Sequence, residues 1–318
     1  MAVPRTGALF CLASAAAFGA MGVFGKLAYH EGVTVGTLLA ARFLVAAAVL
    51  WLVLAATGRL APLRELGRRD VALALALGAV GYSAQAGAYF AALERLDASL
   101  LGLLVYTFPV MVTVAAVLLG RETFSGRTAA ALVLASAGIA LVLAGAAGGA
   151  LDPAGTALGL TAAVVYSAYI LVSEGVAERL GALTLSTLVC TGAAVTLTVG
   201  AAAAGGLHPG AVTGAGFGWL GALSLVSTVG AIGLFFAGLR RVGPTTASIL
   251  STLEPVVTVA LASAVFGEAL GAAQLAGGAL VLAAVVAVRA PKMRPGRERR
   301  APAATAATLP AAELGGPV

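Results

Sequence analysis

Two ionisable residues, Arg42 and Glu254, lie well inside long apolar stretches of the sequence. An ionisable side chain at the centre of a membrane helix costs about 2.5–3.5 kcal/mol on insertion scales, so each of these residues needs a reason to be there. A buried carboxyl can bind a proton on one side of a membrane and release it on the other, or it can hold a solute's amine. A guanidinium can hold a carboxylate in its planar fork. These two residues are therefore the first candidates for chemistry.

Each of the two also has a structural interpretation. Glu254 could be a protonated carboxyl that is hydrogen-bonded across helices. Arg42 could pair with Glu254 or with a solute carboxylate, or it could snorkel to the outer interface. Pro255 follows Glu254 directly and cannot donate to the carbonyl one turn earlier, so a kink is predicted there, and Pro109 predicts a second one.

Polar and aromatic side chains recur at helical spacing around these charges. They form one-sided stripes within three of the apolar stretches, with one further tyrosine in a fourth. The predicted site comprises Tyr82, Gln85, Tyr89, Tyr106, Tyr166, Tyr169 and Ser251, together with Arg42 and Glu254. Such residues can also bridge membrane helices at about 0.6 kcal/mol each. Because the stripes combine apolar walls with a few polar anchors, we expect them to line a cavity for a small solute.

The elements that must position these residues are membrane helices. The chain of 318 residues is 60% hydrophobic, has 42 glycines and is only 10% charged, whereas a soluble domain is about 25% charged. This composition excludes a soluble protein and a nucleic-acid-binding domain. Ten apolar stretches are predicted, near residues 7–29, 33–57, 71–93, 97–119, 127–145, 154–174, 181–203, 214–238, 243–265 and 271–289. Each can cross a bilayer as a helix, the form that satisfies its own backbone in lipid.

An internal repeat organises the ten stretches. At an offset of 146 residues, Pro109 aligns with Pro255 and Glu122 with Glu268, without a gap. The two halves, 7–145 and 154–290, each contain five spans, an odd number, so the second half must enter the membrane upside down. The predicted fold is all-α: a polytopic membrane protein with ten transmembrane helices in a 5+5 inverted repeat, an architecture common among transporters. The remaining residues, 291–318, are predicted to be a disordered cytoplasmic tail.

The charges predict how the chain is oriented. Sixteen of the 19 Lys and Arg residues fall on one side of the predicted spans, and Lys26 and Arg95 fall on the other. Cytoplasmic loops carry the excess of Lys and Arg. Both termini are therefore expected in the cytoplasm.

Several short motifs resemble those of a known family. Arg42 lies in Ala-Ala-Arg-Phe-Leu, Pro109 in Tyr-Thr-Phe-Pro-Val, and Glu254 in Leu-Glu-Pro-Val-Val, and the fourth and ninth spans end in Gly-Arg-Glu and Phe-Gly-Glu. In the ten-span arrangement these motifs resemble the EamA-type branch of the drug/metabolite transporter superfamily over residues 7–290. The resemblance implies an inner-membrane carrier, usually an exporter of small metabolites such as amino acids. It also implies a cavity lined by the first, third, fourth, sixth, eighth and ninth spans.

The functional prediction is a secondary transporter that works by alternating access, with protons as a candidate coupling ion. A lipid-type flippase or a non-transporting membrane scaffold is the alternative. An enzyme is not expected, because His30 and His208 lie in outer loops and no Asp occurs inside a span. No metal, cofactor or nucleic acid is expected as a partner. The solute, the coupling ion and the oligomeric state stay open at this stage.

Overall fold

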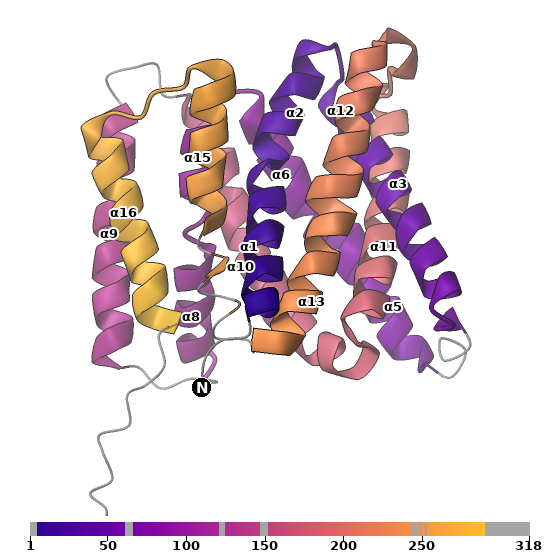
Figure 1. The fold of residues 1–318 in the computed structure, drawn as a ribbon, viewed down its shortest axis with the longest axis horizontal. Coiled ribbons are helices and arrows are strands. Elements are labelled where there is room, and N and C mark those ends of the chain that lie inside the picture. The colour runs from indigo at the N-terminus through magenta and orange to yellow at the C-terminus, as the bar shows by residue number, and fades with distance from the viewer. Residues whose placement is uncertain are drawn as a thin grey trace, which may run out of the picture.

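Helices are the only regular secondary structure in the described residues (Figure 1). The structure is a computed structural model that describes residues 5–60, 66–120, 125–146, 152–242, 247, 250–251 and 253–289. The predicted tail and Glu122 lie outside these residues. Seven helical segments are long and apolar enough to cross a membrane, and three shorter apolar helices accompany them. The expected all-α membrane fold is confirmed.

The first half of the chain contributes five crossings, three of which contain more than one helix. The first is α1 (Arg5–Gly19) with α2 (Met21–His30), and the second is α3 (Val35–Ala56). The third consists of α5 (Arg68–Ala76), the π-helical turn η1 (Leu77–Tyr82) and α6 (Ser83–Leu93). The fourth is α7 (Ala98–Val105) with α8 (Phe108–Leu118), and the fifth is α9 (Gly126–Ala146).

The second half repeats this order. Its first two crossings are α10 (Pro153–Leu180) and α11 (Ala182–Ala203), followed by the short 3-10 turn η2 (Pro209–Ala211). The next crossing again contains a π-helical turn: α12 (Gly214–Ser224), η3 (Leu225–Gly230) and α13 (Ala231–Val242). The last two are α15 (Leu253–Phe266) and α16 (Ala272–Arg289).

Polar side chains mark where several helices begin. The first N–H groups of a helix have no partner within it, and a side-chain oxygen at the N-cap supplies one. Thr34 caps α3, Asp152 caps α10 and Thr213 caps α12, each accepting from the backbone N–H three residues later. Gly181 separates α10 from α11 with a φ of 72°, a backbone conformation that favours glycine.

Helix contacts follow the pseudo-twofold symmetry of an inverted repeat. Helices that occupy the same place in each half pack against each other, α9 against α16 and α3 against α11. Contacts between unlike helices occur in related pairs, because α1 packs against α13 as α10 packs against α6. In Figure 1 the α9/α16 pair forms one end of the molecule, and α1 begins at the same face at which α16 ends. The 5+5 arrangement agrees with this symmetry.

The fourth and ninth crossings are interrupted close to the two prolines. Tyr106 and Thr107 separate α7 from α8, so Pro109 falls in the first turn of a new helix. Pro255 likewise falls in the first turn of α15, which begins at Leu253. A proline is tolerated in a first turn because the N–H that it lacks has no helical partner there. Each predicted mid-helix kink is therefore a helix start that follows a break.

Candidate solute-binding site

Glu254 lies in the first turn of α15, where the positive end of the helix dipole favours a carboxylate. Protein atoms surround its side chain, yet the residue is half-buried by surface exposure rather than fully buried. Within the described part of the chain, neither a hydrogen-bond donor nor a cation pairs with its carboxyl group. The cross-helix hydrogen bond of a structural carboxyl is thus not found there.

The backbone beside Glu254 is satisfied by the fourth crossing. Because Pro255 has no N–H, the carbonyl of Ser251, four residues earlier, loses its usual helical donor. The Tyr106 hydroxyl donates to that carbonyl at 2.7 Å. Thr258 ties the same region to the first crossing, since its hydroxyl donates to the Gly19 carbonyl at 2.9 Å. Glu254 is therefore held on a backbone that two other crossings anchor.

Arg42 lies in the middle of α3, and only 2% of it is exposed. Its Nε donates to the Thr228 hydroxyl in η3 at 2.9 Å. The guanidinium carbon lies 5.0 Å from the Phe43 ring centroid and 5.4 Å from that of Phe90, so cation–π attraction adds to the hydrogen bond. Arg42 does not snorkel in this structure. No ion pair with Glu254 is formed among the described residues.

The predicted tyrosines form a chain of ring contacts across the bundle. Tyr82 contacts Phe43 at a centroid distance of 5.4 Å and Tyr169 at 5.4 Å. Tyr169 stacks on Tyr166 at 6.2 Å with an interplanar angle of 10°. Phe108 continues the chain, 4.6 Å from Tyr166 and 5.7 Å from Tyr106. Two of the three sequence stripes and the separate tyrosine thus meet in one aromatic wall.

Tyr89 and Gln85 lie on α6, beyond Tyr82. Tyr89 is buried, and its hydroxyl is 3.1 Å from the point where a Cβ on Gly22 would lie. The first crossing therefore approaches this hydroxyl closely because it carries a glycine. Gln85 is half-buried on the same stripe.

Arg42 and Glu254 do not neutralise each other within the described residues. Tyr82 lies close to Arg42, because its ring contacts Phe43, over which the guanidinium lies. Such an arrangement can hold a small solute with an anionic and a cationic end, because each end then meets an opposite charge.

Comparison with known families decides the class of protein. The model of the EamA-like transporter family matches residues 5–144 and again residues 153–290. The chain belongs to this family. It is a multi-pass membrane transporter of the drug/metabolite transporter superfamily, and the family is not an enzyme family.

A solved structure, described only as "Crystal structure of protein", has the same fold as this EamA-like chain. The TM-score is 0.62 with 20% sequence identity, over 89% of this chain and 96% of that one. At this identity the likeness concerns the fold alone. A search of curated protein sequences finds no match to the chain.

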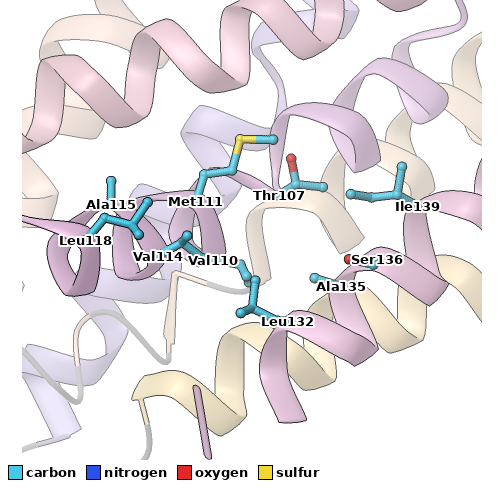
Figure 2. Close-up of a pocket in the computed structure, with 10 residues that line it drawn as sticks. All are labelled: Thr107, Val110, Met111, Val114, Ala115, Leu118, Leu132, Ala135, Ser136 and Ile139. Carbon is cyan, nitrogen blue, oxygen red and sulfur yellow. The ribbon is translucent and has the colours of Figure 1, made fainter. Parts of the chain in front are cut away.

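A pocket of about 260 Å³ lies between α8 and α9 (Figure 2). Its walls are apolar side chains such as Met111, Leu132 and Ile139, and its polar contributions come from Thr107 and Ser136. None of the predicted site residues lines it. Because a polar lipid headgroup would find few partners there, the pocket gives no support to a flippase.

Two kinds of residue in this EamA-like site are missing from the sequence prediction. Phe43, Phe90 and Phe108 complete the aromatic wall, and Thr228 holds Arg42. The repeat contains a signal for Phe108, because it aligns with Glu254 at the offset of 146. Thr228 has no such signal, since its importance follows from the local π-helical geometry.

Proposed function

We propose that this EamA-like protein is a secondary transporter that exports small metabolites such as amino acids by alternating access. The observation that carries the proposal is the pair of mid-membrane charges that do not neutralise each other. Arg42 is buried in α3, and Glu254 is half-buried in the first turn of α15. An amino acid has a carboxylate and an ammonium group, so it complements both charges at once.

Protons are proposed as the coupling ion, with Glu254 as the group that carries them. A half-buried carboxyl that has no fixed partner among the described residues can change its protonation state as the site opens to either side. The alternating exposure itself is a rocking of one half of the inverted repeat against the other. Residues 7–145 and 154–290 are the proposed moving units, and 291–318 is the proposed cytoplasmic tail.

The proposed location is the inner (plasma) membrane, with both termini in the cytoplasm. The uneven distribution of Lys and Arg between the two sides supports this orientation. The positions of α1 and α16 agree with it, because the described chain begins and ends at one face (Figure 1).

A transport screen tests the proposal. Inside-out vesicles containing the protein would be energised by an inward-directed or an outward-directed pH gradient and offered each of the twenty labelled L-amino acids. We expect uptake of at least one amino acid above the level of vesicles without the protein, with a rate that depends on the direction of the gradient. Absence of any amino acid uptake would contradict the solute class, and a rate independent of the gradient would contradict proton coupling.

A further inference from the structure

The third and eighth crossings carry π-helical turns at matching places in the two halves. Each turn has six residues, η1 in the third crossing and η3 in the eighth. A π-helical turn is rare and is frequently found at functional sites. In both turns a hydroxyl donates to the carbonyl five residues earlier: Ser83 to Gly78 at 2.9 Å, and Thr228 to Leu223 at 3.0 Å. The two turns are therefore alike in their local hydrogen bonding.

They differ in what packs against them. At η1 the backbone of α11 approaches so closely that a Cβ on Gly78 would overlap the Val189 carbonyl. At the repeat-related contact between α3 and η3, the side chain of Arg42 inserts and donates to Thr228. One π-helical turn thus serves close helix packing, and the other holds a buried cation.

The Thr228 hydroxyl donates one hydrogen bond and accepts another. Its single hydroxyl proton goes to the Leu223 carbonyl, so the oxygen is left as an acceptor for the Arg42 Nε–H. Phe43 and Phe90 lie against the guanidinium. Tyr82 lies close to the guanidinium, because its ring contacts Phe43 at 5.4 Å, on which the guanidinium also lies. Arg42 is thus held at Nε and against two rings, contacts that leave its terminal nitrogens for binding an anion.

We propose that Thr228 is a positioning residue that aims the terminal nitrogens of Arg42 at the anionic group of the solute. This inference rests on the proposed function, in which Arg42 meets a solute carboxylate. In the structure Arg42 is covered, with Tyr82 as its polar neighbour. The carboxylate takes the place of the Tyr82 hydroxyl, because a charge-assisted, two-point contact with the guanidinium is stronger than a contact with a neutral phenol. Tyr82 is half-buried and belongs to the aromatic wall.

The transport test uses three variants in inside-out vesicles. Thr228→Val removes the hydroxyl and keeps the shape, Thr228→Ser restores a hydroxyl, and Ser83→Ala removes the matching hydroxyl of η1 as the control. The probes are the labelled L-amino acid that the wild type carries fastest and its decarboxylated amine as a competitor. We expect Thr228→Val to raise KM for the amino acid about tenfold or more, the range of a hydrogen bond to a charged group. Its maximal rate and the inhibition constant of the amine should stay within about twofold of the wild type.

Thr228→Ser and Ser83→Ala should behave as the wild type. An unchanged KM in Thr228→Val would overturn the proposal. So would an equal rise of KM and of the amine's inhibition constant, because that result means a general distortion of the site and not a misplaced guanidinium.

A chemical test separates this proposal from the proposed function. Phenylglyoxal modifies arginine side chains, and the extent of modification at Arg42 can be followed by peptide mass spectrometry of the full-length protein. We expect modification about threefold faster or more in Thr228→Val than in wild type or Ser83→Ala, because losing a charge-assisted hydrogen bond frees the guanidinium to move. Equal rates would overturn the positioning role even if the protein carries no amino acid. A lack of amino acid transport, with faster modification in Thr228→Val, would overturn only the proposed solute.

Discussion

The outer ends of the helices and the middle of the bundle each hold one cation from the first half and one carboxyl from the second. At the outer end, Lys26 Nζ lies 2.9 Å from the Glu268 carboxylate, whose side chain is only 7% exposed. The same carboxylate accepts from the backbone N–H groups of Ala98 and Ser99, each at 3.0 Å, and from the Ser99 hydroxyl at 2.8 Å. It thereby caps α7 and joins three crossings. The Glu268 carboxylate therefore has both a cation and several hydrogen-bond donors.

In the middle, Arg42 and Glu254 are not joined, although an unpaired charge is more expensive there than at a helix end. Arg42 has a neutral hydroxyl and two aromatic rings as neighbours. Glu254 has a helix N-terminus but, within the described residues, no donor side chain. Burial and charge alone therefore do not distinguish a functional carboxyl group from a structural one. The contrast lies in the partners: Glu268 has a cation and three hydrogen-bond donors besides, whereas Glu254 has none of these among the described residues.

Breaking the outer pair should have the largest effect on stability. Lys26→Met leaves the Glu268 carboxylate without its cation, and unpairing a buried charge costs about 3 kcal/mol at the low end. The low end applies because 17% of the Lys26 side chain is exposed. Thermal unfolding in detergent, followed by light scattering or intrinsic fluorescence, should show a clearly lower Tm. The double variant Lys26→Met/Glu268→Gln should regain part of the loss, since no buried uncompensated charge remains; Asp97, which lies 3.6 Å from Lys26, is 68% exposed. A Tm equal to that of the wild type would show that the pair is not structural.

The pH dependence of stability should report the same region. Burial opposes ionisation of Glu268, but the hydrogen bonds from Ser99 and Lys26 and the charge of Lys26 outweigh it and hold the pKa of that carboxyl below its ordinary value. A carboxyl with a lowered folded-state pKa stabilises the fold fully above its unfolded value of about 4.3 and loses this contribution as the pH falls through the folded value.

The wild-type Tm should therefore fall more steeply than the Glu268→Gln Tm between about pH 5 and about pH 3. Other acidic groups titrate equally in both proteins, so the difference between the curves isolates Glu268. Parallel curves would be evidence against its ionised role.

The smallest effect is expected at a second ion pair on the same outer side. Arg95 Nη1 lies 3.2 Å from the Asp152 carboxylate, but half of the Arg95 side chain is exposed. Exposed pairs are screened by solvent and contribute little. Arg95→Gln should leave Tm within measurement error, which makes it the matched control for Lys26→Met. A loss as large as that of Lys26→Met would remove the distinction between buried and exposed pairs.

The sequence was sufficient to predict the parts of the fold that depend on bilayer physics. Apolar length predicts the crossings, and the 146-residue offset predicts the symmetry, because both are one-dimensional patterns. Glu254 stands out for the same reason, as a carboxyl within an apolar stretch. These predictions needed no knowledge of which helices touch.

Features that depend on local backbone geometry could not be predicted in this way. A π-helical turn adds one residue to a helical turn without any composition signal, so η3 and the role of Thr228 were not foreseen. Pro109 and Pro255 predict a disturbance, but a proline fits both a kink and a first turn. The partner of Arg42 depends on which of several hydroxyls a neighbouring helix presents, and only the packing decides that.

Transport by Glu254→Gln tests the central claim most directly. Reconstituted wild type, Glu254→Gln and the exposed control Glu94→Gln would be compared for pH-driven flux of the best amino acid, with Tm measured on the same preparations. We predict that Glu254→Gln loses pH-driven flux while its Tm stays equal to or above that of the wild type, because a half-buried carboxyl that has no partner among the described residues adds no stability. Glu94→Gln should match the wild type in both measurements. Unchanged pH-driven flux in Glu254→Gln would contradict the claim that the unpaired central carboxyl serves transport.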